Sequence, residues 1–198
     1  MPRLVLASAS ASRAALLRAA GLEFDVLPAQ IDETEVKRSA RADGASAEDA
    51  ALLLAEQKAR QVSVYMPDAL VIGADQILVC DGEWFDKPAG LAAARDQLRR
   101  LRGHEHVLAT AVVCHRHGRR IWHHIATPRL TMRSFSDAFL DDYLAAEGAA
   151  VTSSVGAYRL EGRGIHLFSE VEGEHGAILG LPMLALLDFL RQQGVLAA

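Results

Sequence analysis

The sequence has few cysteines, no long apolar run and no excess of basic residues. Of its 198 residues only two are cysteines, Cys80 and Cys114, and both lie in apolar runs. This predicts buried free thiols rather than a disulfide framework. No apolar segment is long enough for a signal peptide or a bilayer span, so we expect a cytoplasmic protein without a membrane partner. The net charge of −4 argues against a stable nucleic-acid partner and leaves a small anionic substrate open.

The remaining composition is that of a globular protein. Hydrophobic residues make up 51% of the chain and charged residues 23%. The 6 prolines and 15 glycines are spread along the chain, and neither a linker nor an internal repeat is recognisable. We therefore expect a single domain over residues 1–198, with two closely packed lobes and no independent linker.

Periodicity and turn residues predict alternating strands and helices. We expect strands at residues 3–8, 24–28, 70–80, 84–87, 106–115, 119–132 and 165–171. We expect helices from Ser10 or Ser12 to Gly21, from Ser46 to Tyr65, over 91–101, from Ser136 to Gly148, and over 181–193. Residues 31–35 are acidic and loop-like. This order predicts an α/β fold with a mixed sheet.

The first loop carries groups that suit a phosphate. Ser8, Ser10 and Arg13 lie between the first strand and the first helix, where backbone N–H groups and the helix dipole attract anions. Hydroxyl and guanidinium donors add to this attraction. An ordinary capped helix with small residues in a tight turn explains the same pattern.

Asp75 lies within the apolar run 71–79, where a carboxylate needs a cation, a metal or a hydrogen-bond donor. A solvent-facing position on an amphipathic strand is the alternative. Lys87 is a candidate partner, because it follows the turn at Asp81-Gly82. A two-residue loop would place Lys87 opposite Gln76, on the other face from Asp75. We predict a three-residue loop or a bulge that brings Lys87 to the face of Asp75.

A second group of possible ligands is less suited to a metal. Its residues alternate across the two faces of the predicted hairpin at 106–132 and lack spaced ligand pairs. They are Cys114, His115, His117, His123 and His124. We expect no structural metal among them.

Taken together and in this order, the polar and glycine-containing segments resemble the Maf family of nucleotide pyrophosphatases over nearly the whole chain. The segments are 6–13, Asp32-Glu33, 55–59, 73–75, Lys87-Pro88, Gly103 with His106 and Thr110, 156–158, 161–162 and 180–182. The resemblance implies an elongated mixed sheet with flanking helices and two lobes around a nucleotide-binding cleft. It also implies hydrolysis of a nucleoside triphosphate between the α- and β-phosphates, which gives a monophosphate and pyrophosphate.

The resemblance also assigns roles to residues. Arg13, Lys58 and Lys87 would hold the phosphates, together with Ser8 and Ser10. Asp75, Glu33 and Lys87 would be catalytic, and Glu33 and Asp75 would hold a divalent cation, Mg²⁺ or Mn²⁺. Asp75 could act as general base or as metal ligand. The chain departs from the family at Ala11 and Ser12, where a proline and an arginine or aromatic are common, so phosphate binding should depend more on Arg13.

Two positions bear on the nucleobase. Gln76 and Glu161 are similar to the residues of the 7-methyl-GTP pyrophosphatase branch, whereas members that prefer dTTP and UTP usually carry threonine and glutamine there. The Glu161 carboxylate could accept two hydrogen bonds from guanine N1–H and the 2-amino group. An ion pair with Arg159 or Arg163 is the alternative role for Glu161.

Two other functions stay open at this stage. One is a non-catalytic nucleotide-binding regulator of cell division or stress, and the other is a dTTP/UTP pyrophosphatase. In each case the partner is a small nucleotide. The sequence does not fix the oligomeric state, and a homodimer stays open.

Overall fold

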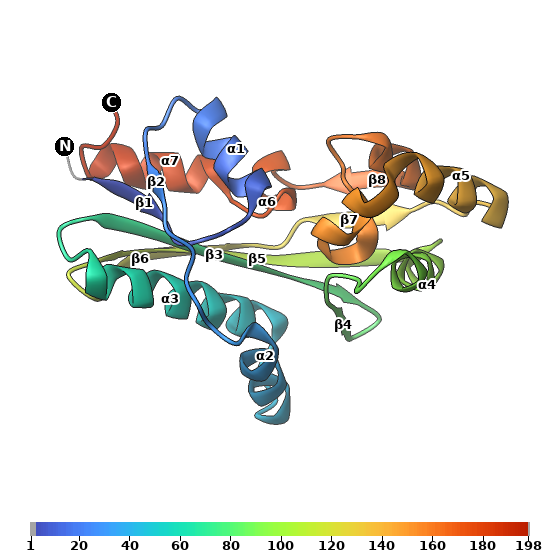
Figure 1. Ribbon diagram of the computed structural model, residues 1–198, viewed down its shortest axis with the longest axis horizontal. Helices are drawn as coiled ribbons and strands as arrows, with labels where there is room; N and C mark the ends of the chain where they lie inside the picture. The colour runs from blue at the N-terminus through green and yellow to red at the C-terminus, as the bar shows by residue number, and fades with distance from the viewer. Residues whose placement is uncertain (1–2, 198) are drawn as a thin grey trace. The chain divides into compact units, whose positions relative to one another are not determined.

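The computed structural model describes residues 3–197, and in these residues it shows an open mixed sheet of eight strands with seven α-helices (Figure 1). The strands are β1 (Leu4–Leu6), β2 (Asp25–Val26), β3 (Leu70–Cys80), β4 (Glu83–Phe85), β5 (Glu105–Arg116), β6 (Arg119–Ala126), β7 (Arg129–Met132) and β8 (Phe168–Glu172). The helices are α1 (Ala11–Ala19), α2 (Glu33–Ala42), α3 (Ala47–Tyr65), α4 (Leu91–Leu101), α5 (Asp137–Glu147), α6 (His175–Ile178) and α7 (Met183–Gln192). The prediction of a mixed α/β fold is confirmed.

The chain divides into two compact units, and each is built from separate stretches of sequence. Unit 1 contains residues 3–76, 109–127 and 174–197, and unit 2 contains residues 77–108 and 128–173. The two long strands β3 and β5 each contribute residues to both units.

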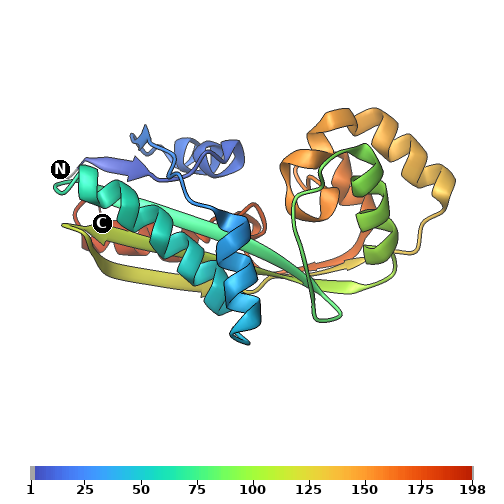
Figure 2. The ribbon, with the colours of Figure 1, turned by 60° about the horizontal axis from the view of Figure 1, so that its bottom comes forward.

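Unit 1 is a three-layer arrangement. Its strand β1 pairs in parallel with β2 and β3, and β6 pairs antiparallel with β5. Helices α1 and α7 cover one face, where Leu17 and Leu186 are fully buried in a core shared with Leu6 and Ile72 (Figure 1). Helix α3 covers the other face, and α2 packs against α3 (Figure 2). Apolar burial on both faces is typical of strands in a parallel sheet.

Unit 2 contains antiparallel strands and the remaining helices. Strand β7 pairs with β5 and with β8, and the end of β3 pairs with β4. Helices α4 and α5 contact each other and a run of 3-10 turns. These turns are at Gly148–Ser153, Val155–Ala157 and Arg163–Leu167. The ends of α5 are set by residues that commonly begin and end helices. Ser136 caps its N-terminus, and Gly148 ends it with a φ of 54°.

The β3–β4 hairpin does not have the three-residue loop that was predicted to bring Lys87 to the face of Asp75. The loop has two residues, because Cys80 pairs with Glu83 and both Asp81 and Gly82 have positive φ, 50° and 78°. This is the tight turn that an Asp-Gly pair favours, since it matches the twist of the strands. The predicted three-residue loop is therefore wrong. The β4 ladder ends at Phe85, before Lys87.

Several predicted boundaries also need correction. The acidic segment 31–35 is not a loop, because Asp32 caps helix α2 and accepts a hydrogen bond from the Glu35 backbone N–H. The strand predicted at 24–28 is reduced to β2, and the strand predicted at 165–171 starts only at Phe168. The short helix α6 was not predicted. Among the described residues no helix is both long and apolar enough to cross a bilayer.

Candidate functional site

A buried lysine at the centre of unit 1 holds two of the predicted carboxylates. The Lys58 Nζ donates to Asp75 Oδ1 at 2.6 Å and forms an ion pair with Glu33 Oε1 at 2.7 Å. The side chains of Lys58 and Asp75 are only 8% and 6% exposed, whereas Glu33 is 48% exposed. Water therefore screens the attraction between Lys58 and Asp75 only weakly, whereas Glu33 is open to solvent.

Local sequence explains how Lys58 reaches Asp75. Lys58 lies on α3, which Ser46 caps by accepting from the Asp49 backbone N–H at 3.0 Å. On β3, a Cβ atom at Gly73 would lie 2.2 Å from the carbonyl oxygen of Ala55. Only glycine allows this close approach of helix and strand. The absence of a side chain at Gly73 therefore lets α3 press against β3 next to Asp75.

Asp75 and Glu33 differ in their surroundings. The Asp75 Oδ2 atom is buried and has no hydrogen-bond partner within the described part of the chain. Partial burial would raise the pKa of the Glu33 carboxyl, but the charge and hydrogen bond of Lys58, followed by the charges of Lys37 and Arg13, hold this pKa below its ordinary value. Glu33 is thus ionised at neutral pH.

Arg13 forms the second cationic part of the cluster. Its Nε donates to the Gly180 carbonyl at 2.8 Å, and its Nη1 donates to the Ala74 carbonyl at 2.8 Å and to Ser8 Oγ at 3.1 Å. Burial lowers the pKa of the guanidinium, and the charges of Asp75 and Glu33 oppose this shift. The three bonds fix the plane of the guanidinium and do not use Nη2.

The loop before α1 caps the helix and also carries the serine hydroxyls that were predicted to bind phosphate. Ser10 caps α1 and accepts from the Arg13 backbone N–H at 3.4 Å, and its own N–H donates to Ser8 Oγ at 3.3 Å. The capped-helix interpretation of this loop is therefore correct at Ser10. The same turn holds Arg13 beside Ala74, the residue that precedes Asp75.

Gln76 has a structural task that its sequence position did not reveal. Its Nε2 group donates to Thr110 Oγ1 at 2.8 Å and to the carbonyls of Ala177 and Ile178 at 3.0 and 3.1 Å. The amide thus joins β3 to β5 and to helix α6. Helix α6 leads directly to Gly180, so Gln76 and Arg13 hold the same segment at two points.

Lys87 and Glu161 belong to unit 2. Glu161 is a third exposed, and its Oε1 accepts from Arg159 Nε at 3.4 Å. Arg159 also approaches Glu147, with Nη1 and Oε2 3.9 Å apart. The alternative ion pair of Glu161 with Arg159 is therefore present. Of the predicted site residues, the structure brings together Ser8, Ser10, Arg13, Glu33, Lys58, Asp75 and Gln76 in unit 1.

Sequence reasoning missed the groups that act through the backbone. The carbonyls of Ala74 and Gly180 anchor Arg13, and Gly73 permits the helix contact. The sequence placed Gly180 only next to the helix predicted over 181–193, whereas it has a φ of 99° and its carbonyl orients Arg13. Its glycine identity and the following proline were the only available signal.

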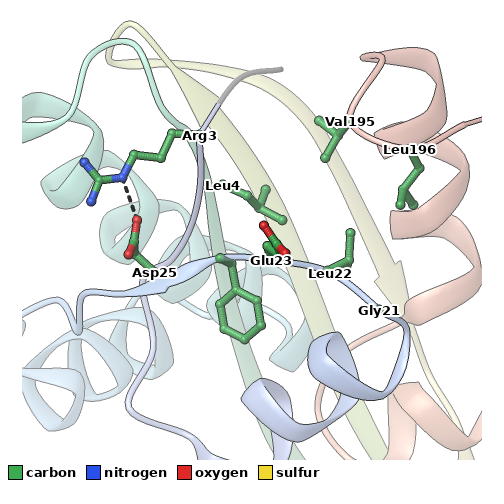
Figure 3. A pocket seen from close by; sticks show the side chains of 9 residues that line it. Arg3, Leu4, Gly21, Leu22, Glu23, Asp25, Val195 and Leu196 are labelled. Atoms are coloured by element: carbon green, nitrogen blue, oxygen red, sulfur yellow. Dashed lines mark hydrogen bonds and ion pairs between the residues drawn. The ribbon is translucent and has the colours of Figure 1, made fainter.

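A separate hollow of about 570 Å³ lies elsewhere in unit 1 (Figure 3). It is lined by Leu4, Leu22, Phe24, Val195 and Leu196, together with Arg3, Gly21, Glu23 and Asp25. Arg3 Nε donates to Asp25 Oδ2 at 2.5 Å across exposed surface. None of the predicted site residues lines this hollow, and Arg3, the one cation among its described lining residues, is already paired with Asp25. Its chemistry therefore does not match an anionic substrate.

The fold and the cluster define an α/β protein in which a buried lysine holds two carboxylates and a buried arginine is fixed next to them by the loop between β1 and α1. The sequence matches the Maf-like protein family over residues 3–193, and the chain belongs to this family.

Named relatives cover almost the entire chain. The chain is 54% identical over 196 residues to the nucleoside triphosphate pyrophosphatase of Rhodospirillum rubrum, a match that covers 99% of this chain and 97% of the relative. It is 53% identical over 194 residues to the protein of the same name from Granulibacter bethesdensis, with 98% of each chain covered. It is 47% identical over 197 residues to the 7-methyl-GTP pyrophosphatase of Rhizobium meliloti, with 100% and 99% covered.

Proposed function

We propose that this protein is a nucleoside-triphosphate pyrophosphatase that cleaves the α–β phosphoanhydride and releases a monophosphate and pyrophosphate. The observation that carries the proposal is the buried Lys58 between Asp75 and Glu33, in a chain about half identical to proteins named for this activity. A buried cation stabilises negative charge that builds up on phosphate oxygens, and two carboxylates beside it can hold a divalent metal that does the same.

The cationic groups would bind the phosphate chain. Arg13 is held by two backbone carbonyls and Ser8, and its remaining Nη2 group can donate to a phosphate oxygen. Lys58 supplies a second positive charge from a position that is nearly closed to water. The hydroxyls of Ser8 and Ser10 add donors in the turn before α1. Lys87 is the third cation in this proposal, on the ground of the family resemblance at Lys87-Pro88.

The two carboxylates fit a divalent cation. Asp75 Oδ2 is buried and has no hydrogen-bond partner among residues 3–197, and Glu33 is half exposed and ionised, so both have oxygen available for a hard metal. Mg²⁺ or Mn²⁺ held there would neutralise charge on the substrate phosphates. In the proposal, Glu33 and Asp75 are its ligands.

The alternative role of Asp75 is to act on the attacking water as general base, in place of ligating the cation. Its Oδ1 is bonded to Lys58, which fixes the carboxylate, and its Oδ2, which has no hydrogen-bond partner among the described residues, would then accept the proton. Lys58 thereby orients Asp75 in addition to binding phosphate. An amide at this position would keep the shape of the side chain and lose the ability to take up the proton.

The proposed substrate is 7-methyl-GTP or another modified nucleotide. One relative at 47% identity carries the name 7-methyl-GTP pyrophosphatase, and Glu161 offers a carboxylate that matches guanine N1–H and the 2-amino group. The Nε2 group of Gln76 is already bonded to three acceptors, so any contribution of Gln76 to base recognition would fall to its oxygen.

The test is a substrate screen with Mg²⁺ or Mn²⁺. Pyrophosphate and monophosphate are measured with 7-methyl-GTP, GTP, dTTP and UTP, for the wild type, Asp75→Asn and Asp68→Asn. Asp68 lies in an exposed turn of the same unit and serves as the matched control. We expect Asp75→Asn to abolish turnover and Asp68→Asn to retain it. Nucleotide binding without turnover in the wild type would refute the enzyme and favour the non-catalytic regulator.

The base preference has its own test. We expect Glu161→Gln to lower the ratio of kcat/KM for 7-methyl-GTP over UTP, while Glu172→Gln, at an exposed position of unit 2, leaves this ratio unchanged. An unchanged ratio in Glu161→Gln would refute the assignment. If Arg159→Met changes the ratio as much as Glu161→Gln does, the effect comes from the ion pair and not from contact with the base.

A further inference from the structure

Three side chains of different ligand types converge at one end of strand β3 in unit 2. They are Cys80, the last residue of β3, Asp81 in the tight turn, and His104, which lies between α4 and β5. One ligand atom of each lies within 4.8 Å of those of the other two. None of the three is among the residues proposed for catalysis, and the group differs from the cysteine and histidines of the 106–132 hairpin.

From this convergence we propose that Cys80, Asp81 and His104 form a binding site for a zinc-like divalent cation. A thiolate, an imidazole and a carboxylate are the ligand types that zinc accepts, and three protein ligands leave a fourth position for water. The thiol proton is released to solvent when the cation binds.

The distances between the ligand atoms fit this proposal. His104 Nδ1 lies 3.0 Å from Asp81 Oδ2, and Cys80 Sγ lies 3.9 Å from the same oxygen. In a tetrahedral zinc site the ligand atoms are about 3.3–3.8 Å apart, as follows from metal–ligand bonds of about 2.0–2.3 Å. Side-chain movements below about 1 Å would therefore produce the required geometry.

The backbone holds the three ligands in place. The tight turn fixes Asp81, and the left-handed Gly103, with a φ of 78°, directs the chain into His104. The His104 backbone N–H donates to Leu101 at 3.0 Å, and its carbonyl accepts from Met132 at 3.1 Å. A site assembled on such fixed segments needs little ordering on binding.

Burial and charge also suit a cation. Cys80 is 5% exposed, whereas the side chains of Asp81 and His104 are 74% and 51% exposed and leave an open path from solvent. The neighbouring Arg100 is paired with Glu83 and lies over the Phe85 ring, so its charge is largely balanced. Thiolate and carboxylate together would neutralise the two charges of the metal.

The test uses Co²⁺ as a spectroscopic probe and Zn²⁺ as competitor with the full-length chain. Thiolate ligation gives Co²⁺ a near-ultraviolet charge-transfer band, which oxygen ligands such as Glu33 and Asp75 do not produce. We expect this band to saturate at about one Co²⁺ per chain and to disappear when Zn²⁺ is added. Cys80→Ser should abolish the band, and Cys114→Ser, at the other buried cysteine, should retain it.

Two further variants keep the proposal open to refutation if Cys80→Ser folds poorly. His104→Ala and Asp81→Asn should each weaken Co²⁺ binding at least about tenfold, and asparagine preserves the left-handed turn. His123→Ala, on exposed β6, is the control. No charge-transfer band in the wild type, or a band of equal affinity in the Cys80 and His104 variants, would overturn the proposal. Hydrolysis is measured separately, so this result is independent of the proposed function.

Discussion

Replacing Lys58 by methionine tests whether the buried cation is what makes Asp75 tolerable inside unit 1. The substitution keeps most of the volume of the side chain and removes its charge. Asp75, with a side chain 6% exposed, then has no compensating cation at 2.6 Å. Breaking one partner of a buried pair lowers the free energy of unfolding by about 3–5 kcal/mol. The loss of the ion pair with Glu33 adds little to this figure, because Glu33 is 48% exposed and water can solvate it.

The double variant Lys58→Met/Asp75→Asn separates this electrostatic loss from lost packing. It removes both charges, so the remaining loss should be that of a buried amide, about 1–3 kcal/mol. The double variant should therefore be more stable than Lys58→Met alone. Arg60→Met on the exposed side of the same helix is the control and should change stability by about 0.5 kcal/mol or less.

Tryptophan fluorescence can report on this unit alone. Trp122 lies on β6 in unit 1 and stacks on Phe189 with ring centroids 4.8 Å apart, whereas Trp84 lies in unit 2. Urea unfolding is therefore followed in a Trp84→Phe background, with circular dichroism as a second probe. A loss below about 1 kcal/mol for Lys58→Met, or a double variant as unstable as the single one, would refute the reasoning.

Three further outcomes follow from the structure. Gly73→Ala should destabilise unit 1 by about 1–3 kcal/mol in urea unfolding, because its Cβ would lie 2.2 Å from a helix carbonyl, whereas Gly90→Ala has open space. Burial lowers the pKa of His106 to about 4 in the folded protein. Between pH 6.5 and 4 the unfolded chain therefore binds a proton at this histidine while the folded protein does not, and the folded state loses stability. About 3 kcal/mol of stability is lost over that range, and His106→Gln, but not the exposed His166→Gln, should remove this dependence when unfolding is measured at both pH values. Arg13→Lys should lower kcat/KM at least about tenfold, because one ammonium cannot replace a guanidinium with three fixed bonds, and equal kinetics would contradict the role of Arg13.

The features predicted correctly from sequence are those set by neighbouring residues. Helix α3 begins after the Ser46 cap and ends before Pro67, and both signals lie within a turn of the boundary. Strand β3 and the position of its Asp-Gly turn were predicted correctly for the same reason, whereas the length of the loop was not. The need of Asp75 for a partner was also predictable, because a carboxylate in an apolar strand is unfavourable alone.

The choice of partner was not predictable from local sequence. Lys58 bonds to Asp75 because α3 crosses β3 at Gly73, and the sequence of neither element alone indicates where they cross. Helix α2 was missed because only Ala40 within it is buried, so it lacks an apolar stripe. The anchors of Arg13 are backbone carbonyls, which any residue type supplies.

The bond from Arg13 to the Gly180 carbonyl has a consequence for the order of events during synthesis. It joins positions 167 residues apart, so the first turn of α1 emerges from the ribosome long before its anchor exists. Contacts of this sequence separation form late, after the entropy of closing the intervening chain has been overcome. Unit 2 can be complete by then, because its last residue precedes α6. A nascent chain can therefore hold Arg13 only through Ser8 and Ala74, and should acquire the complete cluster only as the last two helices dock.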